Sequence, residues 1–262
     1  MSKFCPFFSG SSANSTYIGA SDVGLLVDAG SSFVRLKAAA ECKGVDLSTL
    51  KAVLITHSHT DHIGGLRVLL KKLNLPVIAS PETLAYLEEN GHLPSGTKAI
   101  EIGTDTVDLC GVGVNFFKTS HDAEGSGGYS FLLPDGNKIS VCTDLGVVND
   151  GVREAIKGSN LILLESNHDL KMLKNGPYRP ELKMRIMSDK GHLSNLSASA
   201  ELKGLLQSGT TRFVLGHLSQ QNNLPTLALS SATAALLDLG AKQNADYILK
   251  VAAPQDNEVI YL

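Results

Sequence analysis

Three histidines and one aspartate lie within six residues, in the run Leu54-Ile55-Thr56-His57-Ser58-His59-Thr60-Asp61-His62-Ile63-Gly64-Gly65. Imidazole nitrogens and carboxylate oxygens are ligands that borderline divalent metals such as zinc accept. His57 and His59 are two residues apart, so both can reach one ion from an extended or looped backbone, while Asp61 and His62 can reach a second. A single histidine here would favour a solvated polar loop, but this density predicts a metal site. Gly64-Gly65 allows a neighbouring segment to approach closely.

Three more candidate ligands follow apolar, strand-like runs elsewhere in the chain. They are His121 after residues 112–118, Asp144 after 138–142 and His217 after 212–215. Taken alone, each has an ordinary structural explanation, either a turn aspartate or a histidine that bonds a backbone carbonyl. Because the carboxyl ends of strands in α/β sheets gather functional groups, we expect His217 and His57 to meet at a shared site.

The pattern His57-x-His59-x-Asp61-His62 resembles the signature of the metallo-β-lactamase-fold hydrolases. The resemblance implies an αββα fold of the α/β (α+β) class, in which two packed mixed β-sheets are flanked by helices. It also implies two divalent metal ions, with zinc or manganese expected and iron suitable. The first ion would be held by His57, His59 and His121, and the second by Asp61, His62 and His217, with Asp144 bridging the two. A divalent ion lowers the pKa of its bound water from about 15.7 to roughly 7, and Asp61 would orient that water.

Further segments resemble the YycJ/WalJ group of this family, which implies a metal-dependent phosphodiesterase acting as a 5′-to-3′ DNA exonuclease linked to DNA repair. They are Ser9-Gly10-Ser11-Ser12-Ala13-Asn14-Ser15, Leu164-Glu165-Ser166-Asn167-His168-Asp169, Gly176-Pro177-Tyr178, Leu182-Lys183-Met184-Arg185-Ile186 and Gly191-His192-Leu193-Ser194-Asn195. By resemblance, Glu165 supports His192, which donates a proton to the leaving oxygen or clamps the phosphate. The alternative is that His192 is incidental to a helix-capping loop.

We assign substrate contacts to four further residues. Ser194 and Asn195 begin a predicted helix, whose backbone N–H groups can hold a phosphate. Asn14 lies in the small polar loop near the N-terminus, and His168 is open between substrate contact, support of a ligand and packing. The stretch Lys171–Lys190 is rich in cations; a solvated charged face is its default interpretation, and its position between Glu165 and His192 favours some contact with phosphates.

Apolar periodicity and turn residues predict nine strands and five helices. The strands are expected at 17–18, 24–27, 52–56, 112–118, 129–133, 138–142, 161–164, 212–215 and 247–251, and the helices at 31–43, 63–73, 81–90, 194–207 and 227–239. Ser80 is a predicted N-cap of the third helix, and Ser194 or Asn195 of the fourth.

With 262 residues, 43% hydrophobic and 19% charged, the chain is expected to form one domain over 1–262 with two similar halves. Only 73 positions separate Asp144 from His217, too few for an inserted β-CASP domain. The formal net charge of −3 gives no global basic field, which weakens a polynucleotide substrate. Two alternatives therefore stay open: a small-molecule hydrolase acting on a thioester, lactone or cyclic phosphodiester, and a non-catalytic metal- or nucleic-acid-binding module.

The cysteines and the hydropathy of the chain limit which cellular compartment and which partners we expect. Cys5, Cys42, Cys110 and Cys142 show no CxxC spacing, which indicates thiols in a reducing compartment. No apolar run approaches the length of a membrane span, and the first residues do not resemble a signal peptide. We expect a cytoplasmic protein that has DNA ends as its substrate and no organic cofactor or membrane partner. The sequence does not define the oligomeric state.

Overall fold

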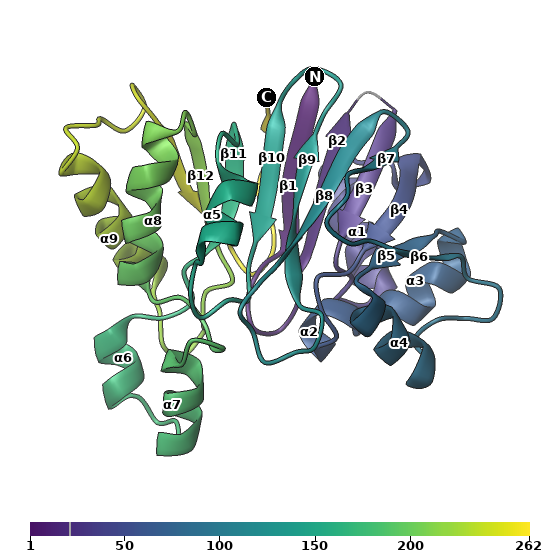
Figure 1. The fold of residues 1–262 in the computed structure, drawn as a ribbon, viewed down its shortest axis with the longest axis horizontal. Helices are drawn as coiled ribbons and strands as arrows, with labels where there is room; N and C mark the ends of the chain where they lie inside the picture. Colours follow the sequence, from purple (N-terminus) through teal and green to yellow (C-terminus); the bar gives the residue numbers. More distant parts are fainter. Residues whose placement is uncertain (21) are drawn as a thin grey trace.

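The apolar runs form two seven-stranded mixed β-sheets in the computed structural model, which describes residues 1–20 and 22–262 (Figure 1). In the first sheet the spatial order is β14 (Ile260–Tyr261), β1 (Ser2–Phe8), β2 (Ser15–Ala20), β3 (Val23–Val27), β4 (Leu50–Leu54), β5 (Val77–Ala79) and β6 (Ala99–Glu101). In the second it is β13 (Ile248–Val251), β12 (Arg212–Gly216), β11 (Leu161–Glu165), β10 (Lys138–Cys142), β9 (Gly127–Leu132), β8 (Val112–Lys118) and β7 (Val107–Leu109).

Each sheet joins an antiparallel part to a parallel part. Strands β3, β4, β5 and β6 run parallel in the first sheet, and β10, β11, β12 and β13 run parallel in the second. The two sheets are therefore built alike, as expected for two similar halves. That residues 1–262 form a single domain without an inserted module stays a prediction.

Helices cover the outer face of each sheet. Against the first sheet lie α1 (Phe33–Cys42), α3 (Leu66–Leu73) and α4 (Pro81–Glu89), with α2 (Thr60–Ile63) and a 3₁₀ turn, η1 (Leu47–Thr49), in the connections. Against the second lie α5 (Asp150–Ile156), α8 (Asn195–Gln207) and α9 (Pro225–Leu237). Helices α6 (Leu170–Asn175) and α7 (Pro180–Met187) project below these layers (Figure 1). The predicted αββα fold is confirmed.

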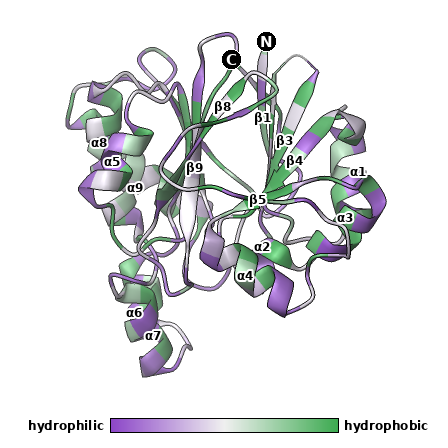
Figure 2. Cartoon of the chain, turned by 45° about the vertical axis from the view of Figure 1, so that its right-hand side comes forward, coloured by the Kyte–Doolittle hydropathy of each residue, from purple (hydrophilic) through white to green (hydrophobic). Residues whose placement is uncertain are grey.

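A continuous apolar core fills the space between the sheets, and hydrophobic colour is concentrated on the strands (Figure 2). It includes Leu54 and Ile78 from the first sheet and Phe131 and Val141 from the second. Tyr129, which is fully buried, donates its hydroxyl across the core to the carbonyl of Ile55, 2.8 Å away. This hydrogen bond ties the second sheet to the segment of the first sheet that leads into His57.

Each predicted strand and helix has a counterpart in the structure, which adds β1, β5, β6, β7, β14, α5, α6 and α7. The predicted helix 63–73 corresponds to α3, which begins only at Leu66, because Ile63 ends α2 and Gly64-Gly65 separates the two helices. Strand β1 was not predicted; it contains Pro6, and the register of its pairing with β2 shifts between Pro6 and Phe8. A proline has no N–H to give to a sheet ladder, so such a shift is the usual solution.

Both predicted N-caps are present. The Ser80 side chain accepts a hydrogen bond from the backbone N–H of Thr83, and the Ser194 side chain accepts one from Ser197. All four cysteines are free thiols in the described part of the chain. No helix within residues 1–20 and 22–262 combines the length and apolarity needed to cross a bilayer.

Candidate metal centre

Five parallel strands deliver polar side chains to one edge of the sandwich. Asp28 directly follows β3 and His57 follows β4, while Asp144, Glu165 and His217 lie at or just after the carboxyl ends of β10, β11 and β12. In Figure 1 this is the lower edge, where α2 follows β4. The sheet arrangement therefore brings together residues that are up to 189 positions apart, from Asp28 to His217.

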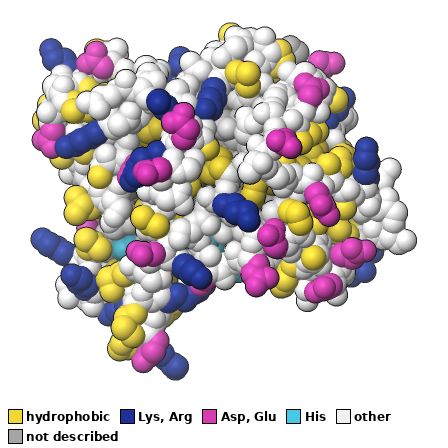
Figure 3. Space-filling model, in the orientation of Figure 1, with side chains coloured by type: hydrophobic (Ala, Val, Ile, Leu, Met, Phe, Trp, Pro, Cys, Tyr) yellow, Lys and Arg dark blue, Asp and Glu magenta, His cyan; other side chains and the backbone are white. Residues whose placement is uncertain are grey.

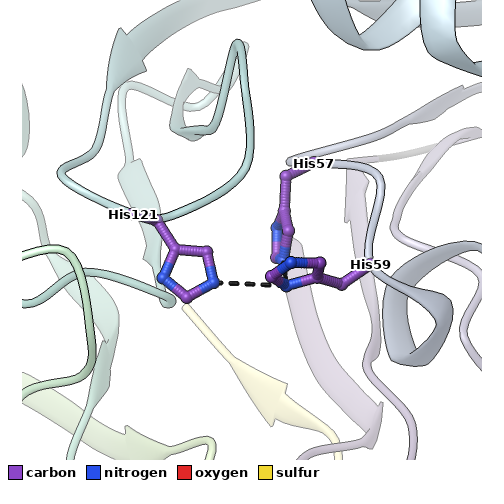
Figure 4. A group of neighbouring side chains, drawn as sticks. All are labelled: His57, His59 and His121. Carbon is purple, nitrogen blue, oxygen red and sulfur yellow. Dashed lines mark hydrogen bonds between the residues drawn. The ribbon is translucent and has the colours of Figure 1, made fainter. Parts of the chain in front are cut away.

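The first group of candidate ligands is His57, His59 and His121 (Figure 4). Nδ1 of His59 lies 3.1 Å from Nε2 of His57 and 3.3 Å from Nε2 of His121. Ligand nitrogens about 2.0–2.1 Å from one tetrahedral ion would be roughly 3.3 Å apart. Both distances from His59 thus match the spacing around a single zinc-sized ion, and all three ligand nitrogens lie within 4.8 Å of one another.

The second group is Asp61, His62 and His217, with Asp144 between the groups. Oδ2 of Asp61 lies 3.4 Å from Nε2 of His62. Oδ2 of Asp144 lies 3.3 Å from Nε2 of His62 and 3.3 Å from Nδ1 of His217. The other oxygen of Asp144, Oδ1, lies 3.9 Å from Nε2 of His121. One carboxylate oxygen therefore faces each group, as a bridging ligand would.

The chemistry of these donors fits divalent cations. Oδ2 of Asp144 and Nδ1 of His217 are buried and form no hydrogen bond with the described residues, a costly state that a bound cation would relieve. Burial and the neighbouring imidazoles hold the pKa of His57 well below its usual value, so the ring is neutral and can ligate. Burial opposes ionisation of Asp144, but His217 and His62 outweigh it and hold the pKa of that carboxyl well below its ordinary range.

Contacts behind the ligands fix their orientation. Nδ1 of His62 lies 2.7 Å from Oδ2 of the buried Asp28, which also accepts a hydrogen bond from the backbone N–H of Thr56. Nδ1 of His121 donates to the carbonyl of Gly191 at 3.1 Å. Asn14 donates from Nδ2 to Oδ2 of Asp61 at 3.1 Å. These partners hold each ring so that its other nitrogen faces the site.

Three of the seven non-glycine residues with positive φ in the described part of the chain lie at this edge. Asp28, Asp144 and His217 have φ values of 63°, 60° and 53°, in the left-handed region. Each such residue costs on the order of 1–3 kcal/mol and persists where the surroundings demand it. The close approach expected at Gly65 is also present, since a Cβ there would meet the Ser31 carbonyl oxygen at 1.8 Å. The fold accepts these conformations where they direct side chains into the site.

The half-buried His192 pairs with the fully buried Glu165 beside the metal ligands. Nδ1 of His192 lies 2.7 Å from Oε1 of Glu165 and 3.8 Å from Oδ1 of Asp144. Oε2 of Glu165 accepts hydrogen bonds from the backbone N–H groups of Leu145 and Leu193. Burial alone would lower the pKa of His192, but the Glu165 carboxylate, aided by Asp144, raises it to about 9.

The four residues predicted to contact substrate are all buried around the site. Asn195 has both its backbone N–H and its side chain in internal hydrogen bonds, with His168, Ser166 and Asn223. The side chain of Ser194 caps α8. These contacts give Ser194 and Asn195 a structural role, and their contact with a phosphate stays a prediction. Asn14 supports Asp61, and His168 keeps a buried Nδ1 without a hydrogen bond to any described residue.

A family model described as "Beta-lactamase superfamily domain" matches residues 24–218, about three quarters of the chain. The chain belongs to the metallo-β-lactamase superfamily. It is therefore a metal-dependent hydrolase, and the family resemblance of its motifs is confirmed. A solved superfamily structure, the metallo-β-lactamase-fold protein YhfI from Bacillus subtilis, matches 99% of this chain and 98% of its own, with a TM-score of 0.74 and 18% identity, which supports the fold.

Two curated superfamily relatives cover most of the chain. Exodeoxyribonuclease YycJ of Bacillus anthracis is 36% identical over 90% of this chain and 90% of its own length. Exodeoxyribonuclease WalJ of Streptococcus pneumoniae serotype 2 is 35% identical over 86% of this chain and 85% of its own. These matches confirm the resemblance to the YycJ/WalJ group.

Two functional contacts were not predicted from the sequence. Asp28 directly follows a strand in Leu26-Val27-Asp28, the same pattern that pointed to Asp144, so the signal was present. Asp122 lies 3.5 Å from Nε2 of His121 and forms an ion pair with Arg185 of α7. Nothing in the local sequence indicates that α7 returns to His121.

Replacing Asp28 by asparagine tests the support it gives to His62. We expect metal affinity to fall about 10–100-fold, because an amide neither matches the carboxylate's charge nor fixes the imidazole tautomer equally well. Metal titration against a chromogenic chelator measures this, with the exposed Asp105→Asn as the matched control. An unchanged affinity in Asp28→Asn would show that His62 does not depend on Asp28.

Proposed function

We propose that this hydrolase is a dinuclear metal-dependent phosphodiesterase that digests DNA from the 5′ end and is linked to DNA repair. The observation that carries the proposal is Asp144, which presents one oxygen to each of two ligand groups and stands beside the Glu165–His192 pair. The names of the YycJ and WalJ relatives support DNA as the substrate. Zinc or manganese are the metals we propose, with iron as a third that suits the same donors.

The ligand sets follow the two groups. His57, His59 and His121 would hold the first ion, Asp61, His62 and His217 the second, and Asp144 would bridge them. When bound, the two ions supply a hydroxide near neutral pH and neutralise charge on a phosphoryl oxygen. Asp61 has a second task, since its carboxylate accepts a hydrogen bond from Asn14 and is held where it can orient the attacking water.

His192 acts on the leaving side of the reaction. Glu165 holds Nδ1 of His192, so Nε2 is the nitrogen that can give its proton to the departing oxygen. The same pair keeps the ring cationic, which favours a phosphate nearby. Glu165 touches no substrate in this proposal; it positions His192 and stabilises its charge. His168, three residues after Glu165, remains a proposed substrate contact, as do Asn14, Ser194 and Asn195.

The acidic composition, with a net charge of −3, keeps a small ester or cyclic phosphodiester as the second candidate. A comparison of kcat/KM values distinguishes the DNA exonuclease from the small-molecule hydrolase. We expect the purified protein, loaded with zinc or manganese, to have a much higher kcat/KM for single-stranded DNA than for thioester, lactone or cyclic nucleotide substrates. A higher kcat/KM for any of these small substrates would move the assignment to the second candidate.

A further inference from the structure

The segment between Glu165 and His192 has an electrostatic character opposite to the rest of the chain. Residues 169–190, here called the basic arm, contain six Lys or Arg and three Asp or Glu. The whole chain has 23 and 26, so the other residues carry 17 basic and 23 acidic side chains. A local positive excess of three on a chain of net charge −3 indicates a surface for a polyanion.

The cations of the basic arm are free to meet such a partner. Lys171, Lys174 and Arg179 are exposed, and none of them forms an ion pair with a described residue. Lys171 and Lys174 are three residues apart on α6 and therefore lie on one face. Lys183 differs, because its Nζ donates to the Lys174 carbonyl at the end of α6. Figure 3 shows Lys and Arg side chains gathered on the projecting lower part of the molecule, with a histidine visible where it meets the body.

The C-terminal end of the basic arm packs against the metal centre. The backbone N–H of His192 donates to the carbonyl of Ile186 at 2.9 Å, and Arg185 pairs with Asp122, which borders His121. A Cβ on Gly191 would meet the Ile186 carbonyl oxygen at 2.2 Å, so the chain is closely packed at this junction. The C-terminal end of the arm is thus held beside the site.

We propose that the basic arm binds the phosphate backbone of the DNA strand whose end lies in the metal centre; this inference rests on the proposed function. The unpaired cations of the arm, Lys171 and Lys174 on α6 and Arg179 at the start of α7, follow one another along the chain, so they can contact neighbouring phosphates of one strand. The exposed Met184 and Met187 on α7 would suit an apolar protein partner, but the excess of unpaired cations favours a polyanion.

The test measures the salt dependence of DNA binding in an Asp61→Ala background, which does not digest the probe. The arm variant is Lys171→Gln/Lys174→Gln/Arg179→Gln. The matched control is Arg67→Gln/Lys71→Gln/Lys72→Gln, which removes the same exposed charges from α3. Fluorescence anisotropy with labelled single-stranded DNA gives Kd between about 50 and 200 mM salt.

Loss of three phosphate contacts should reduce the slope of log K against log salt by about 2, since each contributes roughly 0.7 on single strands. The control should keep the slope of the parent. An unchanged slope in the arm variant, an equal change in the control, or no binding by the parent would each overturn the inference.

A second readout separates the basic arm from the catalytic site. With Asp61 intact, the arm variant should hydrolyse bis-p-nitrophenyl phosphate, which is too small to reach the arm, at the parental rate. A tenfold loss there would mean that the arm acts through the metal centre, and would also overturn the inference. Failure of the proposed function would give a different result. The unmodified protein would not shorten DNA with any metal, whatever the salt dependence of DNA binding.

Discussion

Asp61→Ala should lower the rate of DNA hydrolysis by about 10³-fold or more, because several kcal/mol of transition-state stabilisation depend on the ions and the water that Asp61 orients. His59→Ala should have a comparable effect through the first ion. Both side chains are partly exposed and make few contacts outside the site, so the fold should survive. The measurements are initial rates on DNA, metal content, and the thermal unfolding midpoint of each variant.

Matched controls are available on the surface of the protein. Asp105→Ala removes an exposed aspartate between β6 and β7, and His92→Ala removes a half-buried histidine that stacks on Tyr86. Both should keep the parental rate. Full activity of Asp61→Ala or His59→Ala, with metal content measured, would disprove the mechanism.

The second large effect on DNA hydrolysis is expected for His192→Ala. We expect kcat on DNA to fall about 10²–10⁴-fold, the usual contribution of a positioned proton donor, while metal content changes much less. The loss should be far smaller on a p-nitrophenyl phosphodiester, because that leaving group departs without a proton. The ratio of the two losses distinguishes a proton donor from a residue that only shapes the site.

Glu165→Gln complements that variant, because it keeps the packing around a fully buried side chain. It should also lower kcat on DNA more than on the p-nitrophenyl ester, since it weakens the support of His192. Unchanged turnover in His192→Ala would mean that this histidine is only an incidental residue of the loop before α8. Equal losses of kcat on both substrates would mean that it does not act as a proton donor.

Much of the site was predictable because its residues follow apolar strands. His57, Asp144 and His217 each stand where a hydrophobic run ends, and parallel strands bring such ends to one edge. Asp28 follows the same pattern and was missed because an isolated aspartate after a strand is also an ordinary turn residue. The assignment of seven ligands to two ions came from the family resemblance, since spacing alone does not pair residues that are distant in the chain.

The features that sequence reasoning missed depend on tertiary contacts. Helices α6 and α7 have Leu173 and Ile186 as their only buried residues among those described, so no apolar periodicity marks them. The side chain of Asn195 forms hydrogen bonds with the side chain of Asn223, which lies just before α9, and no pattern in the sequence indicates this contact. Buried polar networks of this kind join residues from separate loops, and their partners are not visible in local sequence.

The most direct test of the account is digestion of DNA labelled at one end, single- or double-stranded, with zinc, manganese or a chelator, beside the Asp61→Ala variant. We predict metal-dependent shortening that begins at the 5′ end, stops with chelator and is lost in the variant. Absence of cleavage with every metal, or cleavage that persists in metal-free protein, would contradict the assignment of this site as a dinuclear DNA exonuclease.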